Sequence, residues 1–191
     1  MLIEESLAQR FQDQYQTLLG HVALTSGLLE KAGKDASGLQ LMTMARNALA
    51  KKPALLAKAM ASMQQAGEPL AQDMRQAIAS LRVGHWVYLR DTSSYSVFLE
   101  TGALAAAYGV KALSEPFKEF LGDSGAIIEA GLLVFHGQII CDDLISLGAW
   151  VGKEYRSEFN ATLAEYRAQG LFFRDRLLPA PGRKPAASKS K

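Results

Sequence analysis

Residues 85–100 read HWVYLRDTSSYSVFLE, and they mark the point where the sequence changes from a helical to an extended pattern. Two runs rich in β-branched and aromatic residues flank a polar turn at residues 92–94, which is typical of a β-hairpin. Before residue 85 the chain is rich in Ala, Leu, Met and Gln, which favour helices, and only two of its 16 aromatic residues lie there. The sequence therefore predicts an α+β fold.

The first half carries apolar residues at the spacing of buried helix faces. Apolar side chains recur every three or four residues over 3–22 and again over 70–81. Two more helices are expected at about 38–52 and 53–67, because Pro53 suits a first helical turn. The N-terminal half thus contains about four helices. The stripe on the first helix is long enough to extend beyond a sheet, which predicts a homodimer formed with a second copy of this helix.

The second half alternates strand-like runs with turns. The apolar runs 126–135 and 138–141 flank His136 and Gly137, which predicts a tight hairpin because glycine tolerates positive φ. Further elements are expected as strands at 108–113 and 144–151, a short helix at 116–121 and a closing helix at 153–169. The predicted fold is a helical N-terminal half packed with a small, mostly antiparallel sheet. Strands and helices do not alternate regularly, which argues against a doubly wound nucleotide-binding fold.

The net charge of +2 is unevenly distributed along the chain. Residues 174–191 hold six basic residues against Asp175 alone, whereas residues 1–173 hold 15 basic and 18 acidic residues. We therefore divide the chain into a helical region 1–84, a β-rich region 85–173 continuous with it, and a disordered basic tail 174–191. The tail is expected to contact nucleic acid or another polyanion weakly; a solubilising tail is the alternative. Its cations are Arg174, Arg176, Arg183, Lys184, Lys189 and Lys191.

Several absences narrow the possible functions. Cys141 is the single cysteine, which excludes an intrachain disulfide and a structural zinc site built on two cysteines. The sequence shows neither a membrane-spanning segment nor a signal peptide, so we expect a cytoplasmic protein. It also lacks the phosphate-loop, zinc-protease, nucleophile-elbow and EF-hand motifs. We therefore expect no cofactor and no metal, and we assign no catalytic residue.

Eight residues of the second half are the candidate ligand-binding set. In a regular strand Trp86, Tyr88 and Arg90 share one face, and aromatic rings beside a guanidinium suit a planar or anionic ligand. The alternative is a sheet face packed on a helix, with Arg90 paired to Glu100 across the hairpin. The full set comprises Trp86, Tyr88, Arg90, Asp91, Tyr95, His136, Cys141 and Asp142.

Three functions are compatible with these observations. The leading hypothesis is a non-enzymatic interaction or regulatory protein that binds a protein partner, because the helices are rich in methionine and the tail is basic. The second is a small-ligand-binding protein or enzyme with its site on the sheet and its turns. The third is a DNA-binding protein that uses the helix at 69–82, which offers Gln72, Arg75 and Gln76 to a duplex.

Overall fold

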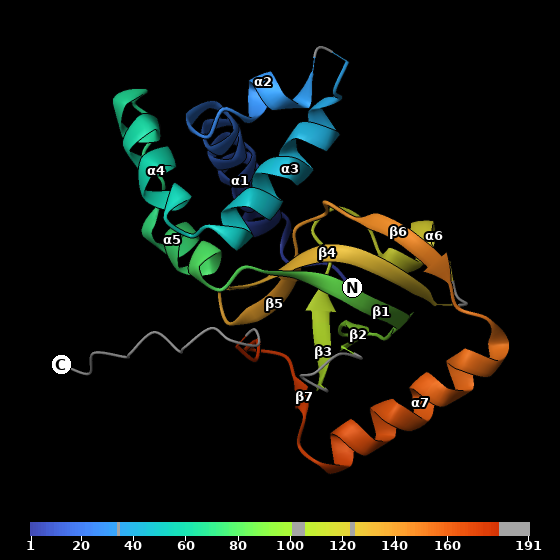
Figure 1. Cartoon of the computed structure of the whole chain (residues 1–191). Helices are drawn as coiled ribbons and strands as arrows, with labels where there is room; N and C mark the ends of the chain where they lie inside the picture. Colours follow the sequence, from blue (N-terminus) through green and yellow to red (C-terminus); the bar gives the residue numbers. More distant parts are fainter. Residues whose placement is uncertain (34, 101–105, 123–124, 180–191) are drawn as a thin grey trace.

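The computed structural model describes residues 1–33, 35–100, 106–122 and 125–179 (Figure 1). A cluster of helices from the N-terminal half lies on one side of a small β-barrel, and a long C-terminal helix lies on another side. The predicted α+β class is therefore confirmed. Most of the predicted basic tail, residues 180–191, lies outside the described residues, including Arg183, Lys184, Lys189 and Lys191.

The described residues of the N-terminal half form five helices, close to the expected number of about four. They are α1 (Glu5–Thr25), α2 (Leu28–Ala32), α3 (Gly38–Lys51), α4 (Leu55–Gln65) and α5 (Gln72–Ala79). The chain turns between α1 and α2 at Gly27, whose φ of 69° is readily adopted by glycine. The apolar stripe of α1, from Phe11 to Val22, is buried against the other helices and the barrel. This part of the stripe is therefore not exposed to a second copy, and the homodimer itself stays an untested prediction.

The strands of the second half close into a five-stranded barrel, which the expectation of a small sheet did not include. The described residues form seven strands in all, and the first five make the barrel: β1 (Arg82–Asp91), β2 (Ser96–Glu100), β3 (Ala106–Lys111), β4 (Ala126–Phe135), β5 (Gln138–Cys141), β6 (Ser146–Trp150) and β7 (Phe172–Phe173). The order β1-β2-β3-β5-β4 is completed by pairing of β4 with β1. Strand β6 adds to the other edge of β4, and the two parallel pairings are β3 with β5 and β3 with β7.

The barrel is covered on three sides because both faces of its strands are apolar. Strand β4 directs Ile128 and Leu132 into the interior, whereas Leu133 and Phe135 point outward into the helical core. Helix α6 (Phe117–Leu121) closes one end of the interior. Helix α7 (Lys153–Ala168) covers the outer face of β1, β2 and β3 through an apolar side that includes Leu163. None of the described helices combines the length and apolar character that crossing a bilayer requires.

The C-terminal segment fills a gap in the barrel wall. Strands β3 and β5 pair at only two positions, and β7 pairs with the middle of β3. The Ile139 N–H, in β5, then donates to the carbonyl of Arg174 (3.1 Å). Leu177 and Leu178 pack against the barrel interior. Residues 174–179 thus belong to the barrel, which corrects the predicted start of the tail, because apolar residues on both sides of Arg174 anchor it.

A polar cluster closes the end of the barrel near this segment. The Arg82 guanidinium donates to the carboxylate of Glu100, to the hydroxyl of Tyr108 (3.0 Å) and to the carbonyl of Leu178 (3.3 Å). The cluster therefore ties the C-terminal segment to the start of β1, the end of β2 and the interior of β3. The alternative ion pair of Arg90 with Glu100 is not formed, because Glu100 is paired with Arg82.

The buried ring of Phe173 provides a test of this C-terminal anchor. We expect Phe173→Ala to lower the free energy of unfolding by about 3–4 kcal/mol, because the ring is buried in the barrel. Urea denaturation of the full chain measures this loss. The matched control is Phe120→Ala, which removes a ring that is 42% exposed and should cost less than about 1 kcal/mol. Equal, small losses in both variants would show that residues 172–179 do not stabilise the barrel.

Candidate anion-binding groove

The residues predicted to bind a ligand lie in separate parts of the protein. Trp86 and Tyr88 are buried inside the barrel. Cys141 lies in the same interior, and burial raises the pKa of its thiol well above the usual range. His136 is exposed at the β4–β5 turn, where its Nε2 lies 3.0 Å from Asp73 Oδ2 of α5. The cysteine and histidine therefore do not form a nucleophile and its base.

A β-bulge moves Arg90 and Asp91 from the faces predicted for them. The register of β1 against β2 shifts between Tyr88 and Arg90, so one extra residue is inserted in β1. The Arg90 guanidinium consequently donates to Asn160 of α7, outside the barrel. Asp91 instead accepts a hydrogen bond from the Tyr88 hydroxyl (3.2 Å). The predicted face shared by Tyr88 and Arg90 is therefore wrong, because a bulge reverses the alternation that a regular strand would keep.

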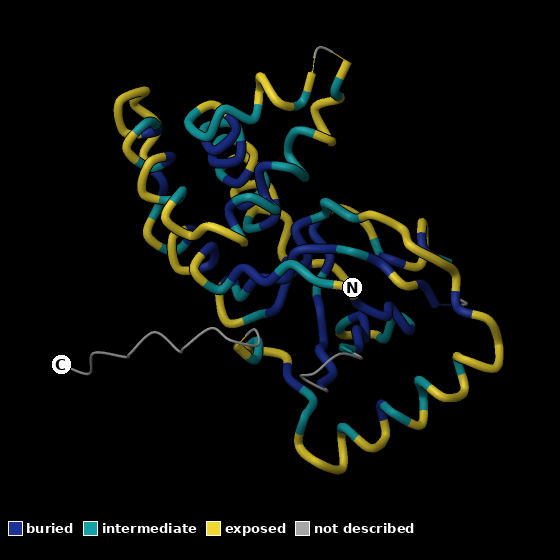
Figure 2. The backbone as a smooth tube through the Cα atoms, in the orientation of Figure 1, coloured by how far each residue is buried: buried dark blue, intermediate teal, exposed yellow. Residues whose placement is uncertain are grey.

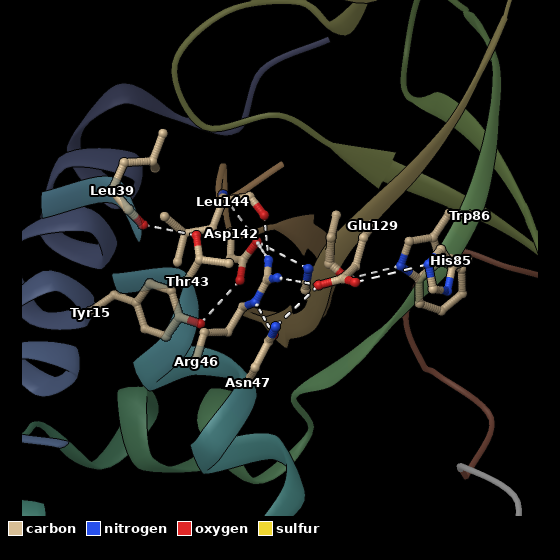
Figure 3. A network of polar contacts seen from close by, with 12 residues as sticks. Tyr15, Leu39, Thr43, Arg46, Asn47, His85, Trp86, Glu129, Asp142 and Leu144 are labelled. Carbon is tan, nitrogen blue, oxygen red and sulfur yellow. Dashed lines mark hydrogen bonds and ion pairs between the residues drawn. The ribbon is translucent and has the colours of Figure 1, made fainter. Parts of the chain in front are cut away.

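Asp142 belongs to a buried polar network that joins the helices to the barrel (Figure 3). The Arg46 guanidinium, from α3, lies 3.0 Å from Glu129 Oε1 and 3.5 Å from Asp142 Oδ1, and it also donates to the carbonyl of Leu144. The Tyr15 hydroxyl, from α1, donates to Asp142 Oδ2 (3.1 Å). Burial raises the pKa of Asp142 to about 6, although Arg46 opposes the rise. The side chains of Arg46 and Asp142 are fully buried, so this network acts within the protein and not on a ligand.

A polar groove of about 600 Å³ lies on the outside of the barrel, and we call it the β3–β7 groove. Its walls are the β1–β2 turn with Ser94 and Tyr95, strand β3 with Gly109 and Lys111, the β4–β5 turn with Gly137 and Gln138, and β7 with the residues after it. Two tight turns thus form its ends, and the C-terminal segment forms one side. Helix α7 covers the neighbouring outer surface of β1, β2 and β3.

Two aromatic rings of the groove pack against each other, and each of them contacts a guanidinium group. The guanidinium carbon of Arg167 lies 5.0 Å from the ring centre of Phe172, which is 5.4 Å from the ring of Tyr95. The guanidinium carbon of Arg174 lies over the Tyr95 ring at 5.7 Å. A β-carbon at Gly109 would lie only 2.9 Å from Arg174 Cγ and 3.0 Å from Tyr95 Cγ. Glycine at this position therefore lets both side chains lie directly on β3.

The groove is positively charged. Three cations line it, Lys111, Arg174 and Arg176, against the single carboxylate of Asp175. Within the part of the chain that the structure describes, none of these three cations lies within ion-pair distance of a carboxylate. Stacking on a ring holds the Arg174 guanidinium without neutralising it, so its N–H groups stay available to an anion.

The sequence predicts some residues of this groove, but in two separate proposed sites. Tyr95 belongs to the predicted ligand-binding set, whereas Arg174 and Arg176 belong to the predicted basic tail, for which no aromatic partner is expected. Lys111 and Phe172 were missed. The signal was the run LFFRDR at residues 171–176, in which aromatic residues directly precede the cations. Only the parallel pairing of β7 with β3 brings this run beside Tyr95.

The helix considered for DNA binding has a less favourable surface. In α5 the exposed side chains include Gln72, Arg75 and Gln76, as the sequence suggested. Asp73, on the same helix, is paired with Arg10 (2.7 Å) as well as with His136. Arg10 is therefore partly neutralised, and duplex binding depends on phosphate contacts from several cations. The DNA-binding helix stays an untested prediction, and the β3–β7 groove is the stronger candidate.

Comparison with known proteins adds no functional assignment. No family model, no curated protein and no solved structure matches this chain. Within the described residues, no group of three or more His, Cys, Asp or Glu side chains is placed to hold a metal ion. The function must therefore be argued from the geometry and charge of the site.

The buried network can be tested by removing its cation. We expect Arg46→Met to lower the free energy of unfolding by about 3–5 kcal/mol at pH 7.5, because the buried carboxyl group of Asp142 would lose its cationic partner. The folded-state pKa of Asp142, about 6, already exceeds its ordinary value, and loss of Arg46 raises it further. Protonation at pH 5 therefore favours the folded variant and should reduce the loss. Urea denaturation at both pH values measures the difference.

The control for this experiment is Arg75→Met, which removes an exposed cation from α5. It should change the free energy of unfolding by no more than about 0.5 kcal/mol at either pH. A loss in Arg46→Met that is the same at pH 5 and pH 7.5 would contradict the assignment, since it would mean that the charge on Asp142 is not what destabilises the variant.

Proposed function

We propose that the protein is a non-enzymatic nucleic-acid-binding protein that holds a single strand in the β3–β7 groove. The observation that carries this proposal is one recess that combines stacked aromatic and guanidinium groups with three cations, none of which has a carboxylate partner among the described residues. Cations that follow a phosphate backbone, together with flat groups that accept bases, are the two requirements of single-strand binding. The sequence predicts a polyanion contact in the tail, and the present proposal assigns that contact to the barrel instead.

Phosphate binding follows from the state of the cations. The Arg174 guanidinium lies against Tyr95 and the Arg176 guanidinium lies 4.7 Å from the ring centre of Phe173. Each ring limits the motion of its guanidinium, so less side-chain entropy is lost when a phosphate binds. Lys111, across the groove, provides a third positive charge without a fixed direction. The site therefore suits two adjacent phosphates better than a single compact anion.

The flat groups favour a single strand over a duplex. Rings and guanidinium planes can stack against an unpaired base, and Arg planes are used in this way for RNA and single-stranded DNA. Here Phe172, Tyr95 and Arg174 follow one another in the groove, and Arg167 contacts the ring of Phe172. In a duplex the bases are already stacked on one another, so only the phosphates would reach this surface. The expected preference is therefore for unpaired nucleotides.

The topology of the barrel lends further support. A five-stranded Greek-key barrel that is partly open is the architecture of OB-folds, which bind oligonucleotides and oligosaccharides on strands 2 and 3 and at the loops 1–2 and 4–5. The β3–β7 groove lies beside the β1–β2 and β4–β5 turns of this barrel. A shared topology does not assign a function, so the proposal rests on the groove's own residues.

Salt dependence gives a quantitative test of the proposal. We expect fluorescence anisotropy with a labelled 20-nucleotide oligothymidylate to give a log–log slope of affinity against salt of about −2, from about 0.7 for each of three phosphate contacts. The double variant Arg174→Ala/Arg176→Ala should bind more weakly and have a slope of about −0.7, since one contact remains. The matched control, Lys51→Ala/Lys52→Ala, removes two exposed charges at the end of α3 and should behave as wild type.

Two further probes distinguish the outcomes. A duplex of the same length should bind less tightly than the single strand at equal salt, because its bases are unavailable. Gly109→Ala should weaken oligothymidylate binding without removing any charge, since the new methyl group displaces Tyr95 and Arg174. The proposal is wrong if heparin and duplex DNA bind as tightly as the single strand, or if both double variants weaken binding equally.

A further inference from the structure

Strand β6 has an open edge, one that pairs with no other strand among the described residues. It pairs with β4 on one side and is the last strand in the order of the sheet. All five of its residues are exposed, and Figure 2 shows this stretch at the surface. The exposure includes two large apolar side chains, Leu147 at 48% and Trp150 at 53%. Phe120, from α6, lines the same hollow as Leu147 and is also exposed.

The sequence of β6 lacks the residues that usually keep another strand from pairing with a sheet edge. Natural proteins usually protect sheet edges with charged residues, proline or a covering segment. Ser146–Trp150 reads SLGAW and contains neither a charge nor a proline. The bulge in its pairing with β4 lies on the already paired side. The backbone groups of the open edge can therefore accept and donate the hydrogen bonds of an additional strand.

Two hollows flank this edge on opposite faces of the strand. Leu147 lines a cavity of about 370 Å³ together with Phe120, and the preceding Ser146 lines a second one of about 640 Å³ together with Leu39 of α3. Consecutive residues of a strand point to opposite faces, so the two cavities lie on the two sides of β6. Ile145 lines both of them. An added strand would direct its alternate side chains into one cavity and the other.

The charged residues described in the two hollows are acidic. Glu115 and Asp143 line the first and Asp35 lines the second, and among the residues that the structure describes no lysine or arginine lines either one. Asp143 accepts a hydrogen bond from Ser114 (2.7 Å), which fixes its carboxylate beside the apolar surface. Carboxylates that border an apolar recess favour a ligand that brings both apolar side chains and cations.

We propose that the open edge of β6 binds an extended segment of a protein partner as an added strand, in which apolar side chains alternate between the two hollows and lysine or arginine lies beside them. A second copy of this chain fits less well, because its own β6 has no cation to offer the carboxylates. This surface is separate from the β3–β7 groove and involves different strands. It gives the expected protein partner a place to bind that is independent of nucleic acid.

A peptide library tests this proposal with the full-length protein. Phage-displayed random 12-residue peptides are selected on the wild-type protein and counted by sequencing. We expect enrichment of sequences with apolar residues at alternate positions and with lysine or arginine among them. A synthetic copy of the most enriched peptide should bind at least about tenfold more weakly to Leu147→Arg, because a charge now lies on the edge and repels the cations. Glu115→Lys should weaken the same peptide.

The matched control is Leu24→Arg, which introduces the same charge at a leucine of α1 that is 58% exposed. It should bind the peptide as wild type does. Circular dichroism checks that all variants are folded. The proposal is overturned if the enriched peptides lack basic residues, or if they bind Leu147→Arg and wild type equally. It is also overturned if sedimentation shows a wild-type dimer that Leu147→Arg dissociates, since the edge would then be occupied by a second copy.

Discussion

The buried guanidinium of Arg46 is the constraint on which the arrangement of the two halves depends. A charge without access to water must be surrounded by acceptors, because its desolvation is costly. Those acceptors come from β4 and from the residues that follow β5, while α1 supplies the hydroxyl that completes the shell of Asp142. Sliding of the helices along the barrel would leave a carboxylate or the guanidinium unpaired. Hydrophobic contact between the halves provides attraction, and this network specifies their register.

A rigid junction on one side of the barrel leaves other parts of its surface free for binding. The helices cover the outward residues of β4 and β5, and α7 covers β1, β2 and β3. The groove beside β7 and the open edge of β6 are among the surfaces that these helices leave uncovered. The first is lined by cations and the second by carboxylates. This opposition of charge suits two different ligands, and it also discourages one ligand from occupying both surfaces.

The C-terminal segment is a case in which long-range strand pairing, and not local composition, determines the structure. Its composition, rich in basic residues and proline, favoured a disordered tail from residue 174. The structure places residues 174–179 on the barrel because Phe173 is buried and Leu177 and Leu178 pack against the interior. Short apolar pairs of this kind have no periodicity to detect. Their burial depends on a gap between β3 and β5 that lies far away in the sequence.

The sequence by itself determined the classes of element and most of their positions, because helix stripes, hairpin turns and proline positions are properties of neighbouring residues. It also located Tyr95, Arg174 and Arg176 as residues of interest. Only the tertiary structure decided that the sheet closes into a barrel, that a bulge redirects Arg90, and that the basic residues after β7 meet the β1–β2 turn. Each of these depends on pairing between distant segments, and a pattern of neighbouring residues carries no information about which distant strand will satisfy its backbone.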